Sequence, residues 1–309
     1  MTGQEKARGP RARRGAFALA VALIVTAGGL ASGDGPAPSV TRTEVPVLPL
    51  ERYELSADEM SAYQRAQKLL AQRCMVSLGF TGFPRDPKMW SGMGRTLTAT
   101  LVDTGPYGLL DPGQARRLGY GVDTKAIADW MPRDRMMTAR ESEVMYGGFE
   151  EEREAVGGRR VPEGGCAGEA SRRLGRGIAD ATRMWGYVSG RRTALEKKSA
   201  EDPRVRHAWG VWSRCLADRG LGRYGNPVDA YTDQAWGRGQ NGDTSRTPRE
   251  MATAKADVEC KRQHRTVEVW SGVQKELERA DIARNRTRYE EVRRDLDVLR
   301  ANVGRASAG

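Results

Sequence analysis

Four cysteines are the residues of this sequence whose type and spacing could do chemistry: Cys74, Cys166, Cys215 and Cys260. Cysteines bind metals, form redox-active dithiols or pair into structural disulfides. A thioredoxin-type dithiol has two residues between its cysteines, and no pair here has that spacing. Zinc needs close pairs of ligands, and His264, four residues after Cys260, completes only half a site. The cysteines therefore predict two disulfides, and we expect no metal and no cofactor.

The skeleton Arg-Cys-x4-Gly occurs twice, in AQRCMVSLGF at 71–80 and in WSRCLADRGL at 212–221. Each Cys falls in the final turns of a predicted helix, and each Gly is placed to end that helix. Four cysteines allow three pairings. The repeat favours Cys74–Cys166 and Cys215–Cys260, because each unit then has one helix ending in the motif and a later helix with the second Cys. We interpret this as a diverged tandem duplication; the alternative is a coincidence among residues common at helix ends.

The N-terminus has the layout of an export signal. A basic stretch at 6–15 precedes an uncharged apolar run at 16–33 that ends in small residues. The run is shorter than the ~20 apolar residues of a comfortable membrane span. Residues 1–33 are therefore predicted to be a signal peptide, and the alternative is a retained membrane anchor at 16–33. Both place the rest of the chain outside the cytoplasm, secreted or anchored, where cysteines pair.

The charge of the chain argues against a nucleic-acid partner. The 51 Lys and Arg exceed the 40 Asp and Glu, for a net charge of +11. Residues 1–33 hold five of these bases and one acid, and the remaining bases are interleaved with acids. A nucleic-acid surface would gather its bases on one face with aromatic platforms between them. An exported protein with mixed surface charge is expected to have a protein or cell-wall partner instead.

The search for catalytic motifs leaves only carboxylates. No G-x-S-x-G elbow, P-loop or H-E-x-x-H motif is present. Glu141, Glu143 and the run Glu150–Glu152 are the one local concentration of acids, a pattern more typical of a solvated loop. Because two carboxyl groups suffice for glycoside hydrolysis, a cell-wall glycan hydrolase is the enzymatic alternative.

Aromatic residues fall into two groups. Trp185, Trp209 and Trp212 lie on apolar helical stripes, so we expect them in the core. Trp90, Tyr107 and Tyr120 lie in Gly/Pro-rich stretches and are the candidates for an exposed contact surface.

The elements that must position these residues are mainly α-helical. Residues 34–54 predict an extended Pro-rich linker, 55–200 a first cysteine unit with a long loop, and 201–309 a second unit with a long C-terminal helix. We expect hairpin- or bundle-like helical units stapled by two disulfides. Leu97–Val102 has the composition of a strand, so short strands are compatible with the region 95–110.

Helix-start signals set the ends of two predicted helices. Ser56 to Glu59 has the pattern of a capping box, and its helix is expected to end at Gly79. A second box at 247–250 opens a helix with no strong breaker before Val303, although a break near 271–272 or 285 is the alternative. A heptad-like seam marks its last part: Ile282, Tyr289, Val292, Leu296, Leu299 and Val303.

The order of these motifs resembles a group of uncharacterised exported proteins of actinobacteria. The resemblance rests on CMVSLGF, then YGLLDPGQARRLGYG, a helix with Cys166 and the second Cys-x4-Gly unit, and it covers most of residues 50–270. Many members of that group look like lipoproteins, whereas no lipid-accepting Cys follows residues 30–33 here. The resemblance implies an envelope location and no particular activity. We therefore expect a non-enzymatic envelope interaction protein that binds a partner through the long C-terminal helix, as its heptad-like seam suggests, or through the loop surface at 80–150.

Overall fold

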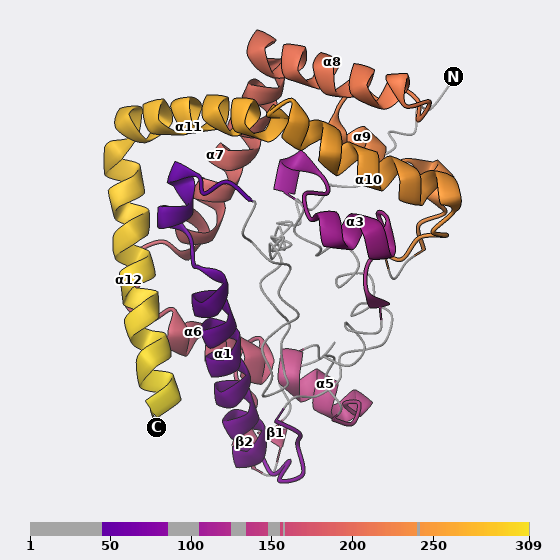
Figure 1. Ribbon diagram of the computed structural model, residues 1–309. Helices are drawn as coiled ribbons and strands as arrows, with labels where there is room; N and C mark the ends of the chain where they lie inside the picture. The colour runs from indigo at the N-terminus through magenta and orange to yellow at the C-terminus, as the bar shows by residue number, and fades with distance from the viewer. Residues whose placement is uncertain are drawn as a thin grey trace, which may run out of the picture.

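Helices make up nearly all the regular structure of the part of the chain that the computed structural model describes (Figure 1). The described residues are 45–85, 105–124, 134–147, 155–156, 158–239 and 242–308. The expected signal segment, most of the linker, Trp90, the strand expected at 97–102 and the acids at 150–152 lie outside them.

The elements follow one another in mainly helical order. They are η2 (Pro49–Tyr53), α1 (Ala57–Ser77), η3 (Gly105–Tyr107), α3 (Pro112–Leu118), α5 (Ala139–Tyr146), β1 (Ala155–Val156), β2 (Arg159–Arg160), α6 (Gly165–Leu174), α7 (Ala181–Glu201), α8 (Pro203–Asp218), α9 (Pro227–Tyr231), η4 (Gln234–Trp236), α10 (Pro248–Gln263), α11 (Thr266–Arg284) and α12 (Arg286–Ala308). The mainly helical class with a long C-terminal helix is confirmed.

The only sheet among the described residues is small. Strands β1 and β2 pair antiparallel, with Ala155 opposite Arg160. Residues 105–107, within the region 95–110 that is compatible with short strands, form a 3-10 turn.

The repeated motif ends α1 and α8 with the same hydrogen bonds. Gly79 N–H donates to Val76 O at 3.0 Å, and Gly220 N–H donates to Ala217 O at 2.9 Å. The next residues, Phe80 and Leu221, each donate back five residues at 3.1 Å. This is the Schellman arrangement, in which the residue after the cap adopts a left-handed conformation. Gly79 has φ +99° and Gly220 has φ +74°, which explains the glycine in each copy.

The C-terminal region forms three helices, with breaks after α10 and after α11. Arg265 interrupts the run in the left-handed region, with φ +51°. Asn285 ends α11, and its side chain donates to Asp281 O at 3.0 Å. The expected alternative of a break near 285 is confirmed, whereas 271–272 lies inside α11. The break at 265 carries no Gly or Pro, so the pattern of residues did not reveal it. Figure 1 shows α12 turning sharply away from α11.

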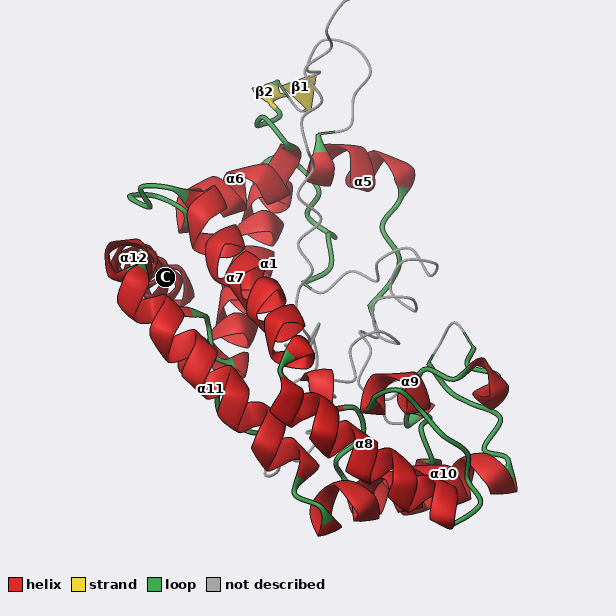
Figure 2. Ribbon diagram, turned by 90° about the horizontal axis from the view of Figure 1, so that it is seen from above, coloured by secondary structure: helices red, strands yellow, loops and turns green. Residues whose placement is uncertain are grey.

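Two apolar cores lie at opposite ends of α11. The larger core joins η2, α1, α5, α6, α7 and α12, and the smaller one joins residues 109–120 to α8, α9, η4 and α10. In Figure 2, α11 runs from the group that holds α12 to the group that holds α10. A small aromatic cluster that includes Tyr107 and Trp270 packs along it, with the two ring centroids 5.1 Å apart.

The cores cross the boundary expected at residue 200. Helix α12, from the predicted second unit, supplies Tyr289 and Leu296 to the larger core. Residues 109–120, from the predicted first unit, pack in the smaller core. Two buried side chains of α10 fix that segment: Lys261 Nζ donates to Leu109 O at 2.9 Å, and Glu250 accepts from Tyr120 N–H at 3.1 Å. Each end of α11 therefore depends on chain from both halves.

Candidate functional site

The two disulfides join Cys74 to Cys166 and Cys215 to Cys260, the pairs that the repeated motif favours. Within each unit, however, the second Cys sits differently. Cys166 is the second residue of α6, whereas Cys260 lies in the last turn of α10. The copies therefore share the helix-ending motif and not the position of the partner Cys, which counts against duplication of the whole unit. Both bonds indicate an oxidising, extracytoplasmic setting.

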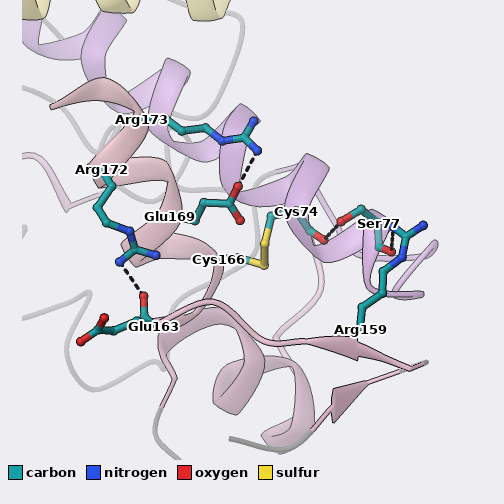
Figure 3. Close-up of a disulfide and its surroundings, with 8 residues drawn as sticks. All are labelled: Cys74, Ser77, Arg159, Glu163, Cys166, Glu169, Arg172 and Arg173. Atoms are coloured by element: carbon teal, nitrogen blue, oxygen red, sulfur yellow. Dashed lines mark hydrogen bonds and ion pairs between the residues drawn. A yellow bond between two sulfur atoms is a disulfide. The ribbon is translucent and has the colours of Figure 1, made fainter. Parts of the chain in front are cut away.

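The Cys74–Cys166 bond pins the last turn of α1 to the first turn of α6 (Figure 3). Arg159, from β2, donates to Ser77 O at the end of α1 at 2.9 Å. Arg172 donates to Glu163 O, just before α6, at 2.7 Å. The disulfide therefore joins α1 to α6, and the two arginines satisfy backbone carbonyls at the end of α1 and just before α6. We call this region the stapled end. It consists of the last turn of α1 with residues 78–83, residues 135–146, and the first turn of α6.

Glu141 locks α5 into the stapled end. Its carboxylate accepts two hydrogen bonds from Arg135, and the one from Nη1 is 2.7 Å long. It accepts a third hydrogen bond from the Thr138 N–H at 2.8 Å. Arg135 also donates to Gly82 O at 3.0 Å, which ties the segment before α5 to the residues after α1. The Arg135 hydrogen bonds outweigh the burial of Glu141 and lower its pKa to about 2. Such a carboxylate stays ionised at neutral pH and serves as an anchor.

Glu143 also has a structural contact. It pairs with Arg140 at 3.2 Å, and both side chains are more than two-fifths exposed. The concentration of acids noted in the sequence thus contributes one buried anchor and one surface ion pair among the described residues. No proton-donating pair forms between Glu141 and Glu143.

Exposed apolar side chains gather on the elements of the stapled end. Tyr146 at the end of α5 is 49% exposed, Met136 before α5 is 44% exposed, and Val76 in the last turn of α1 is 37% exposed. Elsewhere among the described residues, the large exposed hydrophobic side chains lie singly on different elements. They are Val47 on the N-terminal segment, Val228 on α9 and Val269 on α11. Rigid elements that hold several apolar side chains toward water are typical of a protein-binding surface.

Two of the three aromatic residues expected at a contact surface are buried. Tyr107 is 1% exposed and its hydroxyl donates to Gln274, while Tyr120 is fully buried and stacks on Trp236 with centroids 5.6 Å apart. The expectation was wrong for both, because their Gly-rich neighbours turn the backbone so that the ring packs inward. Trp90 lies outside the described residues. Trp212 is buried, as its apolar stripe predicts.

The heptad-like seam of the C-terminal helix is occupied within the chain. Its residues from Tyr289 to Leu299 are at most 1% exposed, and they pack with α1, α6 and α7. A hydrogen bond and an ion pair reinforce this packing: Asp281 accepts from Tyr289 Oη at 2.6 Å, and Asp295 pairs with Arg183 at 2.9 Å. The seam is therefore occupied within this chain, since a helix with heptad spacing packs as well on its own chain as on a partner.

A second polar cluster brings together carboxylates that the sequence keeps far apart. Glu54 after η2, Glu196 on α7 and Glu278 on α11 surround one guanidinium, that of Arg192. Arg192 pairs with Glu54, and Glu278 accepts from Leu50 N–H at 2.8 Å. Burial raises the pKa of all three carboxyl groups, and a single arginine does not offset it. A raised pKa favours the protonated form of a carboxyl group, which is the form that donates a proton.

Within the described ranges, no group of three or more His, Cys, Asp or Glu side chains is arranged to hold a metal ion. In the same residues, none of the helices combines the length and the apolar character needed to cross a bilayer. Comparison of the chain with protein-family models, curated proteins and solved structures finds no match.

Proposed function

We propose that this protein is a non-enzymatic, extracytoplasmic interaction protein of the cell envelope that binds a partner protein through the stapled end. The exposure of Tyr146, Met136 and Val76 on elements fixed by Cys74–Cys166 is the observation that carries the proposal. Aromatic residues and Met are enriched at the buried centres of protein interfaces, and Arg is enriched with them.

Rigidity supports binding at this end. The disulfide and the bonds of Arg135 and Arg159 join the backbone segments that carry the exposed side chains before any partner arrives. A preordered surface loses little conformational entropy when it binds. The half-exposed guanidinium of Arg135 beside the apolar residues adds a polar rim, which suits a partner surface with acidic groups.

The setting follows from the predicted export segment. Residues 16–33 either leave with the signal peptide or hold the protein at the outer face of the membrane. In both cases the helical frame and the stapled end reach partners outside the cytoplasm, which is where the disulfides belong.

Substitution of the exposed residues tests the proposal. The Met136→Ser/Tyr146→Ser variant removes apolar surface at the stapled end, and Val269→Ser on α11 is the matched control with an exposed residue of similar type. We expect the double variant to lose capture of the envelope partner in pull-downs with the purified protein, while the control retains it. Equal capture by all three proteins would contradict the proposed surface.

Glycan hydrolysis is the second candidate, and the raised pKa of Glu54, Glu196 and Glu278 is the observation that favours it. A hydrolase needs one protonated and one ionised carboxyl group. On this alternative, the wild-type protein releases new reducing ends from purified cell wall, Glu278→Gln abolishes the release, and Glu276→Gln on the exposed face of α11 preserves it. Absence of release by the wild type would exclude the alternative.

A further inference from the structure

A lysine and an aspartate are buried side by side in the smaller core. Lys261 is 2% exposed and Asp257, one turn earlier on α10, is fully buried. Lys261 Nζ lies 2.9 Å from Asp257 Oδ2. Burial of a charged pair is unfavourable unless its hydrogen bonds are complete, so a pair in this position calls for an explanation beyond packing.

Aromatic side chains of the smaller core, among them Trp212 and Tyr120, surround the pair. Trp212 Nε1–H donates to Asp257 Oδ1 at 2.9 Å, and the buried Tyr120 hydroxyl has no hydrogen-bond partner among the described residues. On the other side, Lys261 Nζ donates to Leu109 O at 2.9 Å. One carboxyl oxygen thus faces an N–H donor, and the other faces the amine.

Burial disfavours both charges. It raises the pKa of Asp257 and lowers the pKa of Lys261, against the attraction between them. Transfer of one proton from Nζ to Oδ2 gives a free amine beside a neutral carboxylic acid, which is the reactive combination for amide formation.

We propose that Lys261 and Asp257 form an intramolecular amide, an isopeptide cross-link within the last turns of α10. The geometry that carries it is the enclosed contact between Nζ and the carboxyl group, with Trp212 Nε1–H on the opposite oxygen.

The reaction balances without any added reagent. After proton transfer, the Nζ lone pair attacks Cγ of Asp257, and Oδ1 takes up the developing negative charge while Trp212 Nε1–H donates to it. The Cγ–Oδ2 bond then breaks, and Oδ2 leaves as water with the proton it received from Nζ and a second proton from the same nitrogen. One water is released for each amide formed. Enclosure of the two groups keeps them at high effective concentration and keeps bulk water out.

The proposed amide lies where α10 is joined to other parts of the chain. Lys261 directly follows Cys260, which carries the second disulfide, and its contact with Leu109 O joins α10 to the segment before α3. A Cβ on Gly108 would lie 3.3 Å from Nζ, so the backbone of that segment approaches the pair closely. The cross-link would fix the helical conformation of the last turns of α10, next to the attachment point of the disulfide.

Mass spectrometry of the exported, full-length protein tests the cross-link directly. After reduction and alkylation of the cysteines, we expect a mass lower than that of the unmodified sequence by one water. Trypsin is expected to skip Lys261, because its amine is acylated, and to release peptide 256–262 with the same deficit. Fragment ions from cleavage between Asp257 and Lys261 should be missing.

Controls separate the cross-link from other losses of water. Dehydration of Asp257 alone would give the same mass but leave Lys261 cleavable by trypsin, and that result would overturn the proposal. A full-mass protein with free peptide 256–261 would also overturn it. The Lys261→Met variant must show no deficit, and Trp212→Phe, which keeps an aromatic ring without the N–H, is expected to lower the cross-linked fraction at a fixed time after synthesis.

Discussion

Removal of each disulfide should show how much that bond contributes to the free energy of unfolding. The paired substitutions are Cys74→Ala/Cys166→Ala and Cys215→Ala/Cys260→Ala. Alanine is the appropriate replacement because Cys166 and Cys260 are fully buried, and serine would bury a hydroxyl group there.

The expected losses follow from the lengths of chain that the bonds close. The first disulfide spans a sequence separation of 92 and the second a separation of 45. In the chain-entropy treatment these loops correspond to roughly 4.6 and 4.0 kcal/mol of stabilisation at room temperature. Because single domains unfold with about 5–15 kcal/mol, either loss would leave the fold near its limit of stability.

Urea unfolding, followed by circular dichroism and by tryptophan fluorescence, measures these free energies. We expect both paired variants to unfold at much lower urea concentrations than the wild type. The Cys74→Ala/Cys166→Ala variant should lose slightly more stability than the other. As a control, a reducing agent should destabilise each variant further, since one disulfide remains, and should not affect a variant that lacks all four cysteines. If both paired variants lose less than about 1.5 kcal/mol, the chain-entropy reasoning and the role of these bonds as staples are both wrong.

Three other predictions concern single residues. Gly79→Ala and Gly220→Ala should each destabilise by roughly 1–2 kcal/mol in thermal melts, because both positions have positive φ and only glycine adopts it freely; a negligible shift would contradict the Schellman assignment. Tyr289→Phe should lower the free energy of unfolding by about 1.5–3 kcal/mol through loss of the hydroxyl bond to Asp281, and unchanged urea midpoints would refute this. Glu141, whose folded pKa is lowered to about 2, should contribute stability above its unfolded pKa and lose it as the pH falls toward 2. Glu141→Gln should therefore be less stable than the wild type at neutral pH and equal to it near pH 2, and parallel pH profiles would disprove the anchor.

Local signals predicted the parts of the fold that depend on neighbouring residues. The capping box at Ser56 forms as expected, with its hydroxyl accepting from Glu59 N–H and the Glu59 carboxylate accepting from Ser56 N–H. The glycines of the repeated motif end their helices for the reason expected. The second box forms only in part: Thr247 caps α10, but the Glu250 carboxylate binds Tyr120 N–H and Thr244 instead. A distant partner redirected that side chain, and no local pattern reports it.

Long-range contacts explain what the sequence could not predict. Heptad spacing identified the buried face of α12 but not its partners, because α1, α6 and α7 fill that face as well as a second chain would. The Gly-rich context of Tyr107 suggested an exposed loop, although its ring packs on Trp270. The cluster of Glu54, Glu196 and Glu278 comes from three separate elements, so only the folded chain brings those carboxylates together.

Photocrosslinking in intact cells tests the proposed function most directly. A photoreactive amino acid replaces Tyr146 at the stapled end, and the same residue replaces Val269 on α11 as the control for exposure. The account predicts that irradiation joins the protein to one envelope partner from position 146 and not from position 269. No adduct from position 146, or the same adducts from both positions, would contradict it.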